Sequence, residues 1–250
     1  MKFYKITIIS IGAVAVSFLY MSCYKSNVKF VSATNTDFTG KAFVQVYNGT
    51  LSSLRNYVYV DGNAVTGALV AYGATFPSTP SNFSVTSGVR AFLIRDTSST
   101  ILTQPPMSFA ENLDPNKYYT IFMYDTLSSP KQKTVVNDIV IPADTTARVR
   151  FANFIFSKTA VPNVDVYSVK RAANVFTNVA VTDVTGYIPF NSAVTNANAD
   201  TLMVRETGTT ILLAQLNTYL PIRKRSYTLV LRGSYKAATP AKTLSSFSSN

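Results

Sequence analysis

The 250-residue chain has a formal net charge of +11, with 47% hydrophobic and 14% charged residues, proportions typical of a globular protein rather than a disordered one. It contains no histidine, which is the commonest metal ligand and the usual general base near neutral pH. Its one cysteine cannot form an internal disulfide or a thiolate metal cluster. We therefore expect no metal site and no cofactor.

Residues 1–22 have the pattern of an export signal. Lys2 and Lys5 precede an uncharged, mostly apolar run from Ile6 to Met21, which is shorter than the roughly 20 residues that a membrane-spanning helix needs. The only cysteine, Cys23, follows directly, and the sequence from Leu19 to Cys23 resembles the cleavage box of bacterial lipoproteins. In that box the cysteine is acylated and becomes the first residue of the mature protein.

These features predict a lipoprotein of the bacterial cell envelope, which we expect in the outer membrane, facing either the periplasm or the cell surface. Several acyl chains on Cys23 would anchor it stably, whereas a single chain binds only marginally. The polar segment 23–40 is expected to be a tether. Tyr20 departs from the usual box, which has leucine three positions before the cysteine, whereas Leu19 fits relaxed boxes with leucine at the fourth position. The alternative is an ordinary signal peptide or an uncleaved anchor, with Cys23 incidental.

Four blocks of the chain recur in the same order about 105–110 positions later, which predicts a duplicated unit. The clearest pair is Arg95–Leu102 and Arg205–Leu212, each of which follows an apolar run and reads as strand, tight turn, strand. The other pairs are Lys41–Asn48 with Ala147–Asn153, Tyr57–Val60 with Val164–Tyr167, and Lys117–Tyr124 with Arg225–Arg232. We expect a first unit at 41–142, a second at 143–236, and a flexible tail at 237–250.

The expected fold class is all-β, with two tandem Ig-like, Greek-key β-sandwich domains. The chain is rich in tyrosine and phenylalanine, with 15 and 16 residues, and these favour strands. Apolar and polar positions alternate in both units; in the second, Ala147, Val149 and Phe151 share one strand face while Arg148 and Arg150 share the other. Short strands bounded by Gly, Pro, Ser and Asn are typical of such sandwiches.

The opening of the second unit carries a family resemblance. The pattern Val149-Arg150-Phe151-x-Asn153, followed by Pro162-x-Val164-Asp165-Val166-Tyr167, is similar to the start of the bacterial extracytoplasmic domain of unknown function 4397. The first unit keeps a later part of that pattern, Val58–Gly62, but has Gln45 in place of the arginine. The resemblance covers about residues 41–236 and implies a tandem Ig-like sandwich in exported lipoproteins, without implying any activity.

The excess positive charge lies in the second unit, which has eleven basic and five acidic residues, against seven and six in the first. A cationic face there would suit lipopolysaccharide phosphates, anionic lipid head groups or acidic glycans. The alternative is a solvated hairpin tip that aids solubility. The candidate anionic-ligand patch consists of Arg223, Lys224, Arg225, Lys170 and Arg171, with Arg148 and Arg150 beside it.

Other candidate sites have simpler explanations. Five tyrosines (Tyr57, Tyr59, Tyr118, Tyr119 and Tyr124) suggest glycan stacking, but the chain has no tryptophan, so packing is the better interpretation. Acidic residues such as Asp61 and Glu206 fall at expected turns or strand ends, where turn chemistry explains them. No phosphate loop, nucleophile elbow or calcium loop is found, and we expect no catalytic residues and no enzyme activity.

The sequence therefore predicts a non-enzymatic structural or binding module, anchored to a membrane through lipid. One alternative is a glycan-binding accessory lipoprotein of a polysaccharide-uptake system. Another is an adhesin-like module whose partner is a second envelope protein. Nucleic acid is not an expected partner, because the chain begins with an export signal.

Overall fold

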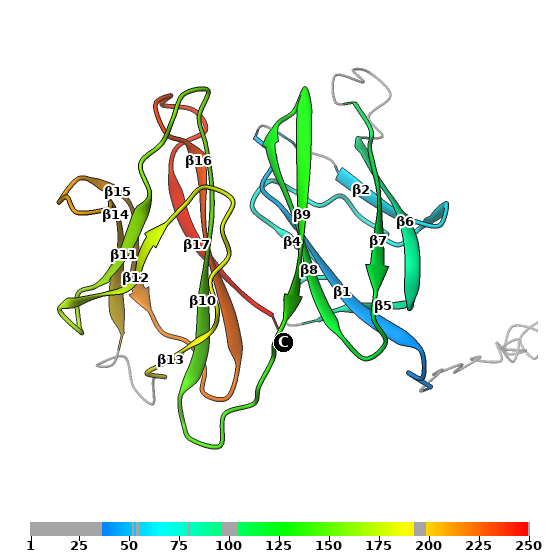
Figure 1. Cartoon of the computed structure of the whole chain (residues 1–250), viewed down its shortest axis with the longest axis horizontal. Coiled ribbons are helices and arrows are strands. Elements are labelled where there is room, and N and C mark those ends of the chain that lie inside the picture. Colours follow the sequence, from blue (N-terminus) through cyan, green and yellow to red (C-terminus); the bar gives the residue numbers. More distant parts are fainter. Residues whose placement is uncertain are drawn as a thin grey trace, which may run out of the picture. The chain divides into compact units, whose positions relative to one another are not determined.

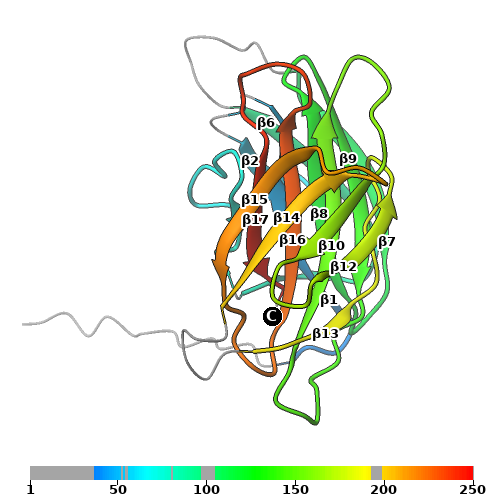
Figure 2. The same ribbon diagram turned by 90° about the vertical axis from the view of Figure 1, so that its left-hand side faces the viewer.

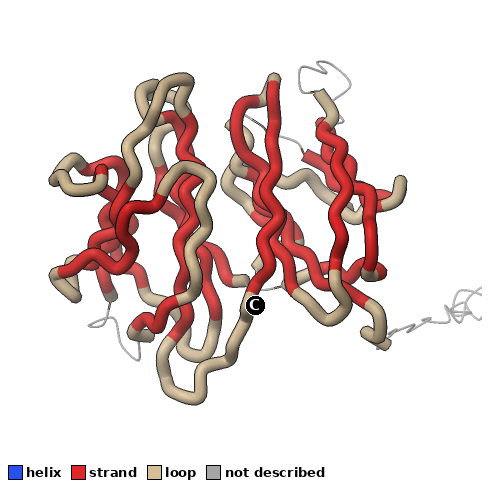
Figure 3. The backbone as a smooth tube through the Cα atoms, in the orientation of Figure 1, coloured by secondary structure: helices blue, strands red, loops and turns tan. Residues whose placement is uncertain are grey.

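The computed structural model describes residues 37–51, 53, 56–79, 81–96, 105–192 and 199–249, and its strands lie in one compact unit, Phe38–Asn250. Figure 3 shows that this part of the chain consists of strands and loops. No helix capable of crossing a membrane is found among the residues that the structure describes. Cys23 and the predicted signal and tether, up to residue 36, lie outside them.

The first half of the unit is a sandwich of two sheets. One sheet has the strand order β4-β1-β8-β9, with β5 also paired to β1, and the other has the order β3-β2-β6-β7. The strands are β1 Lys41–Asn48, β2 Asn56–Val60, β3 Asn63–Ala64, β4 Thr75–Phe76, β5 Phe83–Thr86, β6 Gly88–Asp96, β7 Met107–Leu113, β8 Tyr118–Thr126 and β9 Ser129–Asn137.

The second half repeats this arrangement. Its sheets have the orders β13-β10-β16-β17 and β12-β11-β14-β15. In both halves the first strand pairs in parallel with a later one, β1 with β8 and β10 with β16. The strands are β10 Ala147–Phe156, β11 Val164–Ser168, β12 Ala173–Val179, β13 Ile188–Phe190, β14 Asp200–Glu206, β15 Leu212–Tyr219, β16 Ser226–Ser234 and β17 Thr243–Ser248. The predicted all-β fold with two tandem sandwiches is confirmed.

Each half contains a tyrosine that makes the same hydrogen bond within that half. The backbone N–H of Asp114 donates to the hydroxyl of Tyr119 at 2.8 Å, and that of Ile222 donates to the hydroxyl of Tyr227 at 3.0 Å. Each bond reaches five residues back, from the start of β8 or β16 to the preceding loop. This is the geometry of the tyrosine corner found in Ig-like sandwiches.

Each sandwich has its own core, formed by every second residue of its strands. In the first, Val44, Val46 and Ile121 are fully buried, and in the second Val149 and Phe151 are. The strand alternation in the sequence predicts these positions, because successive side chains point to opposite faces of a sheet. The core residues therefore agree with the sequence pattern.

The two sandwiches also share a third apolar cluster, because the sheet of β1 and β8 packs against the sheet of β10 and β16. This interface cluster consists of Tyr47, Phe122, Ala152, Phe154, Val230 and Phe247. Figure 1 shows the resulting four layers side by side, and Figure 2 shows the sheet of β11, β12, β14 and β15 in front of the sheet of β10 and β16. The inner two sheets are thus covered on both faces.

The structure differs from the sequence prediction at the expected tail. Residues Thr243–Ser248 form β17 and pair with β16 along its length, so a flexible tail is the wrong prediction for this segment. Leu244 lies in the second core and Phe247 in the interface cluster. Those two apolar residues, rather than the surrounding serines, determine where the segment lies.

The recurring hairpins are described in one copy only. In the second unit β14 ends at Glu206, turns through Thr207 and Gly208, and β15 begins at Leu212. In the first unit the turn predicted after Asp96 falls in residues 97–104, outside the described residues. The strands on either side, β6 and β7, are paired as the pattern predicts.

Candidate functional site

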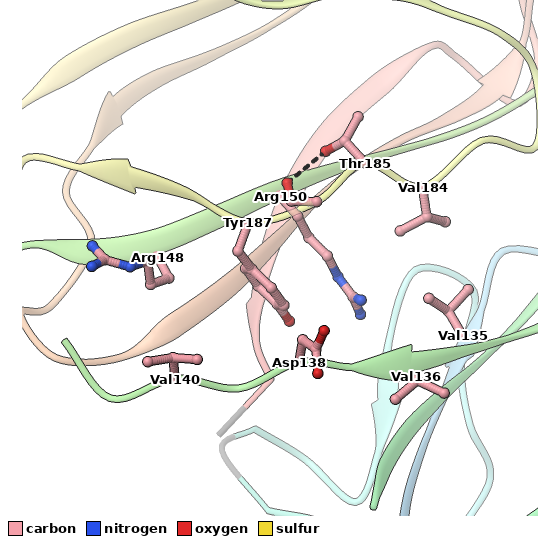
Figure 4. A pocket seen from close by; sticks show the side chains of 10 residues that line it. Val135, Val136, Asp138, Val140, Arg148, Arg150, Val184, Thr185 and Tyr187 are labelled. Atoms are coloured by element: carbon pink, nitrogen blue, oxygen red, sulfur yellow. Dashed lines mark hydrogen bonds between the residues drawn. The ribbon is translucent and has the colours of Figure 1, made fainter.

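A pocket of about 460 Å³ lies where the end of β9 approaches β10. The segment after β9 and the loop before β13 form its other walls. Figure 4 shows the side chains that line it, among them Arg150 and Tyr187. Its apolar walls are Val135, Val136, Val140 and Val184.

Arg150 crosses from the second sandwich to the first at the base of this pocket. Its Nε donates to the hydroxyl of Thr228 at 2.9 Å, beside it in the same sheet. Its Nη2 donates to Asn137 Oδ1 at 2.6 Å and to Thr120 Oγ1 at 3.3 Å, both in the first sandwich. The guanidinium is therefore held between the two sandwiches by neutral groups.

The burial of Arg150 corrects the expectation that Arg148 and Arg150 share a solvent-exposed cationic face. Arg150 is only 2% exposed. Alternation does place both arginines on the face of β10 opposite Val149, but the first sandwich covers that face at Arg150. The same face continues with Ala152 and Phe154, which are also buried. This apolar continuation was the signal in the sequence that both faces of β10 are covered.

The charge of Arg150 has no acidic partner in the part of the chain that the structure describes. No carboxylate among the described residues lies within 4 Å of it, and the guanidinium carbon lies 4.9 Å from the ring centre of Tyr187 and 5.9 Å from that of Phe122. Burial therefore lowers the pKa of Arg150 below its ordinary value. The Tyr187 hydroxyl is itself buried and has no hydrogen-bond partner among the described residues.

Two further charged residues line the pocket. Arg148 is half-buried and donates to the hydroxyl of Thr146 at 2.5 Å, which in turn bonds to Asp144. Asp138 is exposed at the rim. Within the described part of the chain, no three His, Cys, Asp or Glu side chains are arranged to hold a metal ion. The pocket is thus a basic, partly apolar recess.

A second arginine of the second sandwich reaches the first at another place. The guanidinium of Arg232 lies 5.2 Å from the ring centre of Tyr72 and donates to Ser245 Oγ at 2.6 Å. It also lies against Gly73, where a Cβ atom would be only 2.6 Å from Arg232 Nη2, and where φ is +79°. Gly73 therefore provides both the space and the left-handed backbone that this contact needs.

The residues of the predicted anionic-ligand patch lie on two loops of the second sandwich. Arg223, Lys224 and Arg225 are exposed in the turn before β16, whose backbone bonds to Thr146 and Arg148. Lys170 and Arg171 are exposed in the turn between β11 and β12. Arg171 donates to the carbonyl of Pro189, which pairs with Arg148, so both loops adjoin the start of β10.

The contacts of Tyr118, Tyr119 and Tyr124 agree with the packing role expected for the tyrosines. Tyr119 is buried in the first core, and Tyr118 stacks on Phe43 with ring centres 4.8 Å apart. Tyr124 packs against the interface cluster, and Tyr59 lies under Arg95. The acidic residues also make local contacts: Asp61 pairs with Arg90 at 2.9 Å and accepts the N–H of Ala91.

Sequence reasoning missed Asn137, Thr120 and Tyr187 as parts of the site. Thr120 and Asn137 are separated by 17 residues and bond to each other across the β8–β9 pair. Tyr187 lies just before β13, in a loop without a motif. Nothing in the local sequence links these residues to Arg150, because the link is made by the packing of the two sandwiches.

Comparisons with known proteins support the family resemblance. Residues 42–167, just over half of the chain, match the model of the domain of unknown function DUF4397. This match begins in β1 and ends in β11, so it covers the first sandwich and the Arg150 motif of the second. A comparison with curated proteins gave no match.

Proposed function

The chain belongs to the DUF4397 family, and from this premise we propose that it is a non-enzymatic structural or binding module of the bacterial envelope. In this proposal Cys23 carries lipid and holds the protein at the outer membrane. Residues 23–40 then act as a tether, and the two sandwiches form the structural or binding module. A second DUF4397 domain at 143–236 is part of the same proposal.

The observation that carries this proposal is the buried interface between the sandwiches. Phe122 stacks on Phe154 with ring centres 4.8 Å apart, and Arg150 and Arg232 bridge the same interface. Contacts of this kind remove the freedom that a simple linker would leave between two domains. A rigid unit on a tether suits a protein that presents a fixed surface away from a membrane.

The membrane anchor is tested by expressing the full chain in a Gram-negative host and labelling with an alkyne analogue of palmitate. We expect label on the wild-type protein and its recovery with outer-membrane fractions in a density gradient. The matched variant Cys23→Ser should be unlabelled and leave the membrane fraction. An unlabelled wild-type protein, or a Cys23→Ser variant that stays in the membrane with unchanged mass, would reject the lipoprotein assignment.

A second candidate function is supported by the exposed basic turn at Arg223–Arg225. Its three side chains form no ion pair with an acid among the described residues. Such a turn suits acidic glycan or lipopolysaccharide phosphate, as in an accessory protein of polysaccharide uptake. A glycan array probed with the full chain tests this candidate; selective retention of acidic glycans is the expected result, and uniform retention or none rejects it.

A further inference from the structure

We propose that the Arg150 pocket binds a small organic carboxylate, held by the guanidinium of Arg150 and the hydroxyl of Tyr187. This inference rests on the proposed binding function and names its site and ligand class. Its test is independent of the anchor at Cys23.

The first argument is the incomplete coordination of a buried cation. A guanidinium has five N–H donors. The hydrogen bonds of Arg150 use Nε and Nη2, and Nη1 donates none to the described residues. Burying a charge is costly unless an opposite charge or hydrogen bonds compensate it. A bound anion would supply the compensation that the neutral oxygens of Thr120, Asn137 and Thr228 give only in part.

The second argument is independent of the first and concerns Tyr187. Its hydroxyl is buried without a hydrogen-bond partner among the described residues, although buried polar atoms are nearly always bonded. Tyr187 lines the pocket, and its ring lies beside the Arg150 guanidinium, as Figure 4 shows. Arg150 Nη1 and the Tyr187 hydroxyl, neither of which donates a hydrogen bond to the described residues, suit an acceptor-only group with two oxygens, which is a carboxylate.

The residues that line the pocket indicate what kind of molecule carries the carboxylate. Val135, Val136, Val140 and Val184 give the pocket apolar sides, and its volume of about 460 Å³ lies within the range of small-molecule sites. A small molecule with an apolar portion therefore fits this pocket better than a fully hydrated ion. Asp138 at the rim disfavours multiply charged anions, because a like charge nearby raises their free energy of binding.

The experiment uses the full chain in detergent and isothermal titration calorimetry with three probes. Benzoate is the carboxylate, benzyl alcohol is the neutral probe of similar shape, and inorganic phosphate is the anion without a carbon body. We expect benzoate to bind at least about tenfold more tightly than benzyl alcohol, as expected for losing a hydrogen bond to a charged group. Phosphate should bind more weakly than benzoate. No binding of benzoate, or binding no tighter than that of either other probe, would overturn the proposal.

Variants locate the site. Tyr187→Phe keeps the ring and removes only the hydroxyl, so it should fold normally and weaken benzoate binding by about tenfold. Asp138→Asn should strengthen binding, because it removes the like charge at the rim. Arg150→Gln introduces the residue that the first unit has at Gln45 and should abolish binding. Unchanged affinity in Tyr187→Phe and Asp138→Asn would show that benzoate binds elsewhere, even if Arg150→Gln did not fold. If the wild-type chain carries no palmitate label at Cys23, the lipid anchor is refuted, and the result on benzoate binding is unaffected.

Discussion

Arg150 Nη2 lies 2.6 Å from Asn137 Oδ1, so a buried cation of the second sandwich is held by a neutral amide of the first. Asn137 is itself held by Thr120, whose hydroxyl lies 3.0 Å from Asn137 Nδ2. The contact joins β10 to the end of β9. It makes the stability of each sandwich depend on the other.

Replacing Asn137 by alanine should destabilise the protein by about 1.5–3 kcal/mol, the range for hydrogen bonds to charged groups. The physical reason is that Arg150 would stay buried with one partner fewer. Urea unfolding followed by circular dichroism measures the change. Asn112→Ala on β7 is the matched control, since Asn112 is exposed, and should alter stability by less than about 0.5 kcal/mol. Equal effects of the two substitutions would contradict the role given to Asn137.

Phe122→Ala should cost about 3–5 kcal/mol, as is usual when a large buried aromatic side chain is removed. Phe122 is fully buried and contacts Phe154 and Tyr47 with ring centres 4.8 and 5.9 Å away. Denaturant unfolding again gives the free energy. Ile141→Ala, at a side chain that is 69% exposed, should change little. A cost for Phe122→Ala as small as that of the control would mean that the sandwiches do not pack through this cluster.

The two tyrosine corners give a prediction with an internal control. Tyr119→Phe and Tyr227→Phe should each destabilise the protein by about 0.5–1.5 kcal/mol, because each removes a hydrogen bond to a backbone N–H. Tyr118→Phe, at the residue directly before Tyr119, removes a hydroxyl without a hydrogen bond among the described residues and should be nearly neutral. Thermal unfolding of the three variants makes the comparison. A neutral result for both corner tyrosines would count against their role.

Stability should fall at alkaline pH partly through Tyr72. Burial raises the pKa of Tyr72 to about 12 from its ordinary value of 10.0, although the charge of Arg232 acts in the other direction. In the unfolded chain this tyrosine loses its proton near the ordinary value, while the folded protein keeps it. The contribution is therefore complete below pH 10.0 and is lost as the pH rises toward about 12.

Tyr72→Phe, which cannot ionise, tests that contribution. Urea unfolding of both proteins at pH 8, 10 and 11 should show a smaller loss of stability in the variant than in the wild type. Other ionising groups are the same in both, so they cancel in the difference. Parallel curves for the two proteins would refute the prediction.

Charge reversal at the basic turn should abolish salt-sensitive retention on an anionic polysaccharide column, if the turn is the glycan site. The variant is the triple substitution of Arg223, Lys224 and Arg225 by glutamate. A single-site comparison is also available, because Lys117 stands in the first unit where Arg225 stands in the second. Arg225→Glu should reduce retention and Lys117→Glu should not; unchanged retention of the triple variant would leave the turn a solvated hairpin tip.

Much of the fold could be predicted from the sequence, because strand alternation has a physical cause. Val149 and Phe151 on one face, with arginines on the other, identify a strand and its core side. What alternation cannot tell is whether the second face meets water or another sheet. At Arg148 it is half-buried beside a loop, and at Arg150 it is covered by the first sandwich.

The candidate site was less predictable for the same reason. Arg150 was part of a recognisable pattern, but its partners Asn137 and Thr120 belong to the other sandwich and become neighbours only through packing. The prediction of a flexible tail is wrong at Thr243–Ser248 because the composition there is dominated by small polar residues. Two apolar side chains, Leu244 and Phe247, are buried when the segment pairs with the edge of β16, and their burial fixes the segment as a strand.

The interface between the two sandwiches is approximately symmetric. Gln45 and Arg150 hold equivalent places, opposite Thr120 and Thr228, and each crosses to the other half: Gln45 to the carbonyl of Ser248, Arg150 to Asn137. The same surface of two copies therefore meets itself, as in a twofold homodimer. Separate sandwiches with this face would pair only at sufficient concentration, whereas two sandwiches in one chain make the pairing intramolecular. The two halves differ at this place, where the first has Gln45 and the second has Arg150.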